Sequence, residues 1–283
     1  MLNDIYGHEV IKKKLCELKN NLPLLTIFNG PSYIGKGHTA INYIDEIYNG
    51  KIIHRINSHP DIKIFQPSTK TFKIEYIHQI QEDLMEKPFE LDKKYYILKN
   101  TEFMNKHSAN ACLKMFEETP HFNHFFILVT DISLLPSTIS SRGITFNFYP
   151  IPNLKRFFPN LTEQQERLLC GCPGLLDKVT SPITQLLLDK VHFLLDNFKS
   201  LSYAQLLLWF KEIEDLEEVD FSFLIDILQL VLLENRKKGK DFNLFPILMK
   251  KIELFKEKLN LTLNLKIHFK NILIDSKYIL SEG

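Results

Sequence analysis

Residues 22–37 read LPLLTIFNGPSYIGKG, an apolar run that leads directly into a glycine-rich turn. The run over residues 22–28 predicts a buried strand, and residues 39–48, which follow the turn, have helical spacing. Strand, glycine-rich turn and helix in this order are typical of a phosphate-binding loop, where a helix N-terminus faces the phosphates. The stretch therefore predicts an α/β fold with a phosphate loop over residues 30–37.

Further apolar runs alternate with helical segments through the first half of the chain. The expected strands are 62–65, 94–98 and 125–130, and the expected helices are 10–18, 74–85 and 108–118. This alternation predicts a parallel sheet covered on both faces. After the proline-punctuated link at residues 149–152, helical patterns alone continue to the end. We therefore expect an α/β domain at 1–148, a small helical domain at 149–182 and an all-helical domain at 183–283.

Composition and charge restrict the class of protein. The 283 residues contain 35 Lys+Arg and 34 Asp+Glu, a formal net charge of +1. This balance excludes a basic chain held to nucleic acid by bulk charge. No segment resembles a signal peptide or a membrane span, so we expect a cytoplasmic protein. The cysteines fit neither a zinc site nor a disulfide framework, and we expect unpaired packing residues and no metal: Cys16, Cys112, Cys170 and Cys172.

The phosphate loop lacks a residue that magnesium requires. Gly30, Gly35 and Lys36 match the pattern G-x-x-x-x-G-K. The next position should be Ser or Thr, whose hydroxyl holds Mg²⁺, but it is Gly37, and Thr39 lies too far along the chain. We expect residues 30–37 to form a degenerate phosphate loop.

The strand at residues 94–98 lacks the acids that should end it. In a P-loop ATPase this strand closes on an Asp that holds Mg²⁺. Here Lys99 and Asn100 follow, which inverts the charge at the metal position. Because two independent metal-binding elements are absent together, we expect a nucleotide fold that does not hydrolyse ATP.

An arginine follows the last predicted strand of the α/β domain. Ser137 and Thr138 can cap a short helix, which would place Ser141 and Arg142 at its far end, near the domain rim. A guanidinium is planar and always charged, which suits a phosphate oxygen of another subunit. An arginine finger supplied in trans accelerates GTP hydrolysis by about 10³–10⁵. The alternative is a surface arginine in an ion pair, the usual fate of a single arginine.

Four stretches together resemble the clamp-loader subunits of bacterial DNA polymerase III, an AAA+ family. Residues 5–8 (IYGH) with the phosphate loop resemble the family's opening, and residues 58–61 (SHPD) resemble its HPD element. Residues 105–120 (NKHSANACLKMFEETP) are similar to the family helix N-A-L-L-K-x-L-E-E-P-P. Residues 134–143 (LLPSTISSRG) are similar to L-L-P-T-I-x-S-R-C, with Gly143 in place of the cysteine. The resemblance covers roughly residues 1–180.

The resemblance implies an AAA+ domain, a helical lid domain and a helical collar domain for oligomerisation. A broken phosphate loop with a retained Ser141-Arg142 is the combination of the delta-prime type. That type implies a non-hydrolysing stator that presents Arg142 to ATP on a neighbouring gamma subunit. The implied partners are gamma/tau and delta subunits and, through the complex, the sliding clamp and primed DNA. ATP is then expected only on the partner subunits.

Two departures from the family pattern carry further expectations. Many members have a four-cysteine zinc module before the HPD element, but residues 48–57 contain no cysteine, so no zinc is expected. Residues 171–174 lie where a sensor helix would begin and contain no arginine, which indicates no nucleotide sensing. We expect His59 to shape a turn, and we expect Glu117 and Glu118 to form ion pairs, which could cross a subunit interface.

Two alternatives remain open at this point. One is an active AAA+ ATPase, similar to the gamma/tau subunits, with unusual metal ligands. The other is a stand-alone AAA+ relic that acts as an adaptor protein.

Overall fold

The computed structural model describes residues 2–67, 72, 74–216, 219–239, 244–258 and 264–282. The chain forms two compact units. The first comprises Met1–Asn160 and Cys170–Leu175, and the second comprises Leu161–Leu169 and Leu176–Gly283. The division into three domains at residues 148 and 182 stays a prediction.

The first unit is built on a five-stranded sheet with the strand order β2-β3-β4-β1-β5, all neighbours being parallel. The strands are β1 (Leu25–Asn29), β2 (Ile62–Phe65), β3 (Lys94–Lys99), β4 (Asn123–Val129) and β5 (Ile144–Asn147). The parallel sheet predicted from the apolar runs is confirmed. Strand β5 was not predicted, because it is a short edge strand with two exposed positions and gives a weak apolar signal.

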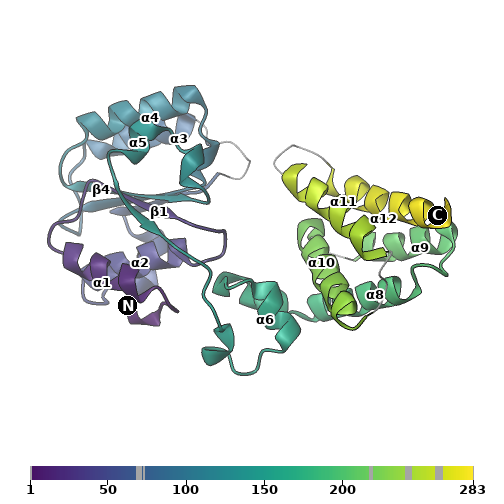
Figure 1. The fold of residues 1–283 in the computed structure, drawn as a ribbon. Helices are drawn as coiled ribbons and strands as arrows, with labels where there is room; N and C mark the ends of the chain where they lie inside the picture. Colours follow the sequence, from purple (N-terminus) through teal and green to yellow (C-terminus); the bar gives the residue numbers. More distant parts are fainter. Residues whose placement is uncertain are drawn as a thin grey trace. The chain divides into compact units, whose positions relative to one another are not determined.

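Helices cover both faces of this sheet. Figure 1 shows α3, α4 and α5 on one face and α1 and α2 on the other. These helices are α1 (Glu9–Leu18), α2 (Lys36–Ile47), α3 (Ile74–Leu84), α4 (Lys106–Glu118) and α5 (Ser137–Ser140). Short 3₁₀ helices in this unit are η1 (Leu2–Asp4), η2 (Ile53–Ser58), η3 (Thr101–Phe103), η4 (Ile132–Leu134), η5 (Leu154–Arg156) and η6 (Pro173–Leu175).

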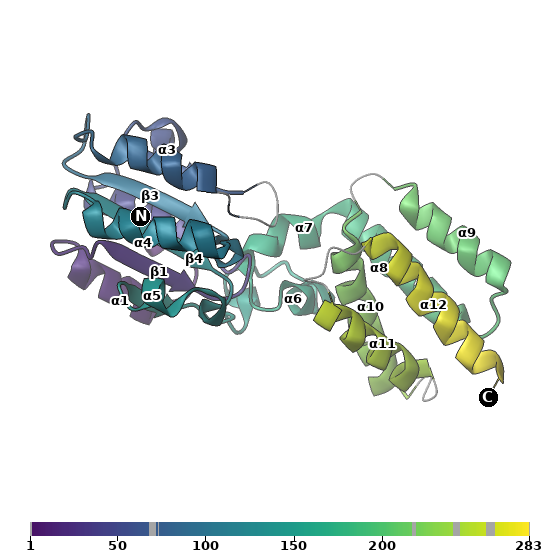
Figure 2. The same cartoon turned by 90° about the horizontal axis from the view of Figure 1, so that it is seen from above.

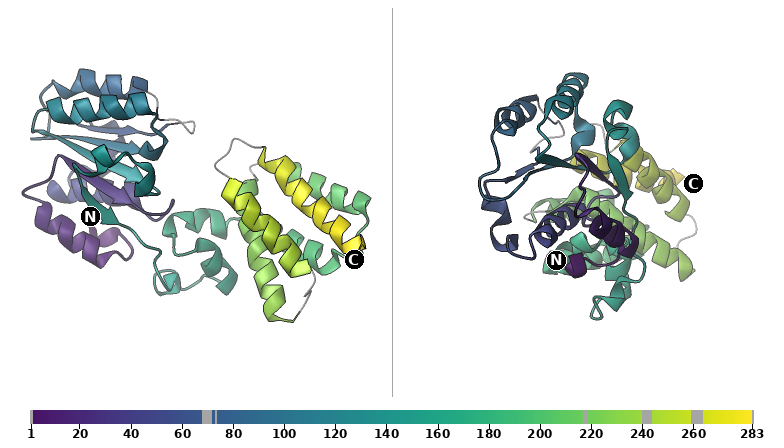
Figure 3. Two further views of the ribbon diagram at one scale, coloured as in Figure 1. Left: turned by 45° about the horizontal axis from the view of Figure 1, so that its top comes forward. Right: turned by 90° about the vertical axis from the view of Figure 1, so that its left-hand side faces the viewer.

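One hydrophobic core of the first unit lies between the sheet and helices α3 and α4. Every residue of β4 is buried, and Phe125 and Ile127 of this strand pack with Ile77 of α3 and Met115 of α4. Burying one such side chain contributes about 1.5–3 kcal/mol. Figure 3 shows the sheet between its two layers of helices. The phosphate loop follows β1 and therefore lies at the carboxyl edge of this sheet.

The cysteine prediction is confirmed in one part and wrong in another. All four cysteines are among the described residues, and none of them is in a disulfide. Cys112 and Cys172 are buried, as packing residues should be. Cys16 and Cys170 are exposed, so the prediction that all four cysteines are packing residues is wrong for these two.

The second unit is helical throughout its described residues. Its helices are α6 (Glu163–Leu169), α7 (Leu176–Thr180), α8 (Pro182–Asn197), α9 (Tyr203–Glu214), α10 (Phe221–Lys237), α11 (Leu244–Lys258) and α12 (Leu265–Glu282). Helix α10 packs against α8, α11 and α12 (Figure 2), and most of its apolar side chains, including Leu224, Leu228 and Val231, are buried. Asp220 caps α10 by accepting from the N–H groups of Ser222 and Phe223. Within the described ranges, no helix is long and apolar enough to cross a membrane.

Candidate functional site

The phosphate loop joins β1 to α2, and its geometry requires glycine at positions 30 and 35. A Cβ at Gly30 would lie 2.4 Å from the carbonyl oxygen of Phe148, and the φ of Gly30 is +150°. Gly35 precedes α2 with a φ of +102°, a conformation that side chains rarely adopt. The predicted loop residues therefore shape the turn from the sheet edge into the helix.

Lys36 is folded onto its own loop. Its Nζ donates to the carbonyl oxygens of Gly30 (2.5 Å) and Pro31 (2.8 Å), and the residue is buried. Burial lowers the pKa of Lys36 to about 8, while the negative charge of Glu102 opposes this shift. Most Lys36 side chains are therefore still protonated at pH 7, and two of the three ammonium protons are already engaged.

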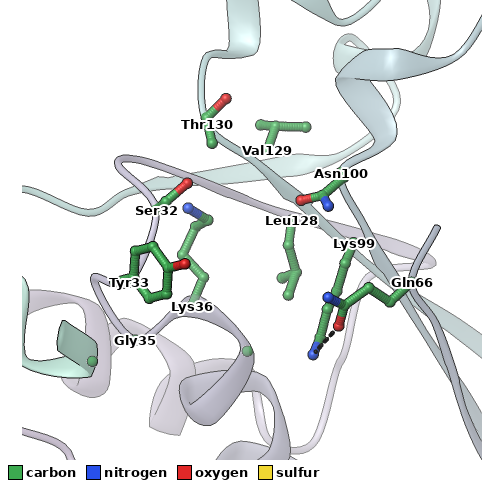
Figure 4. Close-up of a pocket in the computed structure, with 12 residues that line it drawn as sticks. Ser32, Tyr33, Gly35, Lys36, Gln66, Lys99, Asn100, Leu128, Val129 and Thr130 are labelled. Atoms are coloured by element: carbon green, nitrogen blue, oxygen red, sulfur yellow. Dashed lines mark hydrogen bonds between the residues drawn. The ribbon is translucent and has the colours of Figure 1, made fainter. Parts of the chain in front are cut away.

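A pocket of about 390 Å³ opens beside this loop at the carboxyl edge of the sheet (Figure 4). The residues that line it, none of them acidic within the described part of the chain, are Ser32, Tyr33, Gly35, Lys36, Gly37, Gln66, Lys99, Asn100, Leu128, Val129, Thr130 and Gly174. Two lysines, Lys36 and Lys99, thus line this pocket and give it the electrostatic character of an anion site.

The two departures from the metal-binding pattern meet in this pocket. A Cβ at Gly37 would lie 3.6 Å from Cε of Lys99 and 4.0 Å from its Nζ. The Nζ of Lys99 donates to Oε1 of Gln66 at 3.0 Å, which fixes the end of the lysine side chain beside Gln66 (Figure 4). The lysine therefore lies beside the position from which a Ser or Thr hydroxyl would reach Mg²⁺.

The residues in this pocket do not fit a magnesium ion, which P-loop ATPases bind together with ATP. Magnesium requires oxygen ligands, usually one or two carboxylates with water and phosphate oxygens. Gly37 supplies no oxygen from its side chain, and the ammonium of Lys99 repels a cation. Over the described ranges, no three His, Cys, Asp or Glu side chains are grouped so that they could hold a metal ion.

Three polar residues at the carboxyl edge of the sheet were not predicted from the sequence. Gln66 follows β2 directly, and Thr130 follows β4 directly, so both lie where parallel strands end. Glu102 is buried, and its Oε1 accepts from the backbone N–H (3.0 Å) and the hydroxyl (2.6 Å) of Thr130. Polar residues immediately after buried strands are the signal that would have found Gln66 and Thr130.

The segment over residues 171–174 contacts the phosphate loop. The N–H of Gly174 donates to the carbonyl oxygen of Tyr33 at 2.9 Å, and a Cβ at Gly174 would lie only 2.7 Å from that oxygen. Both residues also line the pocket. This backbone contact requires glycine at position 174, since any side chain there would push the segment over residues 171–174 away from the phosphate loop.

Arg142 lies away from the pocket, at the end of α5. Its Nη1 donates to the carbonyl oxygen of Thr138 (2.7 Å) and its Nη2 to Oε1 of Glu117 (2.6 Å). The side chains of Arg142 and Glu117 are 41% and 58% exposed, so this ion pair is at the surface. Glu117 is thus paired within the chain. The predicted cap is wrong: α5 begins at Ser137 after Pro136, with no side-chain hydrogen bond at its N-terminus.

Ser141 and Gly143 flank the arginine in different ways. Ser141 is the C-cap that follows α5, and its hydroxyl donates to the carbonyl oxygen of Thr138 at 3.3 Å. A Cβ at Gly143 would lie 2.9 Å from Cγ of Leu25 and 3.0 Å from its carbonyl oxygen. A cysteine would therefore collide with β1, which explains why glycine replaces it here.

The element at residues 58–61 is structural in its contacts. His59 is buried, and its Nδ1 accepts from the N–H of Asp61 at 3.1 Å. The carboxylate of Asp61 accepts from the N–H groups of Phe89 (2.6 Å), Glu90 (2.7 Å) and Leu91 (2.8 Å). These contacts agree with the turn-shaping role expected for His59.

Comparison with known proteins supplies an independent view of this chain. Residues 19–152 match the family described as DNA polymerase III, delta subunit. The gamma/tau subunit of DNA polymerase III from Mycoplasma pneumoniae is 29% identical over 166 residues, which are 53% of this chain and 24% of that protein. The delta′ subunit from Buchnera aphidicola subsp. Schizaphis graminum is 29% identical over 112 residues, 39% of this chain and 34% of that protein.

The match covers only part of these relatives, about a quarter of the gamma/tau subunit's length. Among solved structures, a DNA polymerase III gamma subunit-related protein from Thermotoga maritima has a TM-score of 0.58 and 18% identity, and the match covers 95% of this chain and 98% of that one. This likeness concerns the fold, and it confirms the predicted architecture of an α/β domain followed by helices.

Proposed function

We propose that this chain is a delta-prime-like clamp-loader subunit that does not hydrolyse ATP itself, because residues 19–152 match the family described as DNA polymerase III, delta subunit, and the relatives include gamma/tau and delta′ subunits. In this role it acts as a stator. It helps to load the sliding clamp onto primed DNA in a complex with gamma/tau and delta subunits.

The observation that carries the proposal is the position of Lys99 beside Gly37. Hydrolysis in P-loop proteins needs a metal ion that bridges the β- and γ-phosphate oxygens. In this pocket the hydroxyl ligand is absent, and a cationic side chain stands where the acidic ligand belongs. Both requirements for metal binding therefore fail at one place, which supports a subunit without its own ATPase.

The contribution of this chain to catalysis would be Arg142. The arginine does not line the chain's own pocket, and its guanidinium is exposed and fixed by Thr138 and Glu117. A guanidinium held in this way can exchange the Glu117 carboxylate for the γ-phosphate oxygens of ATP on a neighbouring subunit. There it would stabilise the charge that develops during phosphoryl transfer.

The test is the ATPase of the assembled clamp loader with Arg142→Ala in this chain. We expect normal assembly and a lower DNA-stimulated rate, because the ATP site that faces this chain loses its arginine. Arg55→Ala is the matched control, since Arg55 is also an exposed, ion-paired arginine of the first unit, bound to Glu90. An assembled Arg142→Ala complex with an unchanged rate would exclude this role.

A gamma/tau-like ATPase is the second candidate, because a gamma/tau subunit is among the relatives at 29% identity. The pocket argues against it, since an ATPase with unusual ligands still needs oxygen donors for the metal. Turnover of Mg-ATP by the purified chain would favour this candidate. A stand-alone adaptor would instead fail to associate with gamma and delta subunits.

A further inference from the structure

The pocket at residues 30–37 retains two cationic side chains although it has lost its metal ligands. Lys36 and Lys99 both line it, and no acidic side chain does so within the described ranges. Glu102 is close enough to influence Lys36, but its Oε1 is held by Thr130 and the residue does not line the pocket. A volume of about 390 Å³ is within the range of small-molecule sites.

Lys99 is not neutralised where it stands. Its hydrogen-bond acceptor is the uncharged amide of Gln66, and no carboxylate among the described residues lies within ion-pair distance of it. This ammonium lies beside the first turn of α2, near Gly37. Since two of its three protons are not used by Gln66, it can donate to two further oxygens.

The loss of the side chain at position 37 makes room for this ammonium. A hydroxyl-bearing residue would have its Cβ 4.0 Å from Nζ of Lys99, and its Oγ would compete for the same space. The two substitutions therefore form one arrangement, in which a fixed ammonium takes the place of a metal ion and its ligand. A cation at this place is what the oxygens of a polyphosphate require.

We propose that this pocket binds the polyphosphate of a nucleotide without a divalent metal ion, with the ammonium of Lys99 in the position of the metal. The loop that contains Lys36 and the N-terminus of α2 supply the remaining contacts. Without a metal ion to bridge the phosphates, the bound nucleotide is held and not cleaved. The inference goes beyond the stator role and does not depend on Arg142.

The test is calorimetric titration of the purified full chain with ATP, AMP and inorganic tripolyphosphate, first in EDTA and then in excess Mg²⁺. We expect ATP and tripolyphosphate to bind in EDTA, and AMP to bind at least about tenfold more weakly because it lacks the polyphosphate. Mg²⁺ should weaken ATP binding about tenfold, since the ion and Lys99 compete for the same oxygens. Tighter binding of ATP than of tripolyphosphate would show contacts to the nucleoside, and equal binding would identify the polyphosphate alone.

Variants separate this site from general charge attraction. Lys99→Gln should weaken ATP binding in EDTA by about tenfold or more, because a charged donor to the phosphates is removed. Lys87→Gln is the control, since Lys87 is an exposed lysine that does not line the pocket. The double variant Gly37→Thr with Lys99→Asp restores the metal ligands and should bind ATP only with Mg²⁺.

Several results would overturn the proposal. One is that a chain shown to be folded by circular dichroism does not bind ATP in EDTA. Another is that ATP binding requires Mg²⁺. A third is that the Lys99→Gln and Lys87→Gln variants bind ATP with equal affinity. Failure here would leave the Arg142 experiment unaffected, because that experiment measures ATP hydrolysis on a neighbouring subunit.

Discussion

At the scale of single residues, His124 is a buried base in the centre of the sheet. It lies on β4, its Nδ1 is 3.1 Å from the carbonyl oxygen of Pro23, and its ring stacks on Tyr95. Burial lowers the pKa of His124 to about 4, although the contact with Pro23 opposes the shift. The imidazole is therefore neutral in the folded chain at neutral pH.

This histidine should make the fold sensitive to acid. The unfolded chain takes up the proton near pH 6.5 and the folded chain near pH 4. The contribution of neutral His124 to the free energy of unfolding is therefore fully present above pH 6.5. It is lost as the pH falls towards 4, by up to about 1.4 kcal/mol per pH unit. Urea unfolding at pH 7, 6 and 5 should show a smaller loss for His124→Gln than for the natural chain. The exposed control His78→Gln should leave the slope unchanged; an unchanged slope in His124→Gln would contradict the prediction.

Gly143 provides a second test at this scale. Gly143→Ala should destabilise the first unit by about 1–3 kcal/mol, because the new Cβ would meet Leu25 at 2.9–3.0 Å. Gly37→Ala is the comparison, since its Cβ would make ordinary contacts at 3.6 Å. Urea unfolding measures both. Equal stabilities of the two variants would contradict the prediction, because they would show that β1 can shift to accommodate a Cβ at position 143.

At the scale of elements, Asp61 connects the beginning of β2 to the loop that precedes β3. Its carboxylate accepts from three successive backbone N–H groups, at Phe89, Glu90 and Leu91, and its side chain is buried. Hydrogen bonds to a charged acceptor are roughly twice as strong as neutral ones. One side chain thus fixes the path of the loop between α3 and β3.

Removal of this carboxylate should loosen the loop and destabilise the unit. Asp61→Ala leaves three N–H groups without their acceptor, and we expect a loss of about 3 kcal/mol in the free energy of unfolding. Hydrogen exchange at residues 89–91 should accelerate in the same variant. Glu86→Ala, which removes an exposed carboxylate from the same loop, should change neither measurement. Unaltered exchange at residues 89–91 in Asp61→Ala would argue against the role of Asp61.

At the scale of the whole molecule, the proposed role requires association. The purified chain should show no turnover of Mg-ATP, and a mixture with gamma and delta subunits should give one stable complex. Size-exclusion chromatography with mass measurement would detect it. Persistence of the chain as a monomer in that mixture would contradict the stator role and favour an adaptor.

The sequence determined the sheet, the phosphate loop and the family resemblance, because each depends on local pattern. Apolar runs of strand length and the glycines of residues 30–37 are read within one short window. The sequence also showed the loss of the metal site, because Gly37 departs from the phosphate-loop pattern and Lys99 stands where an acidic residue is expected. Strand β5 was not, since a half-exposed edge strand has little apolar periodicity.

Only the tertiary structure decided which of these residues meet. The strand order β2-β3-β4-β1-β5 places β4 between β1 and β3, yet the carboxyl ends of all these strands lie at one edge. This edge brings Lys99 to Gly37 and Gln66, and the α4–α5 packing brings Glu117 to Arg142. No local pattern contains such pairs, because distances between distant segments are set by how the sheet is assembled.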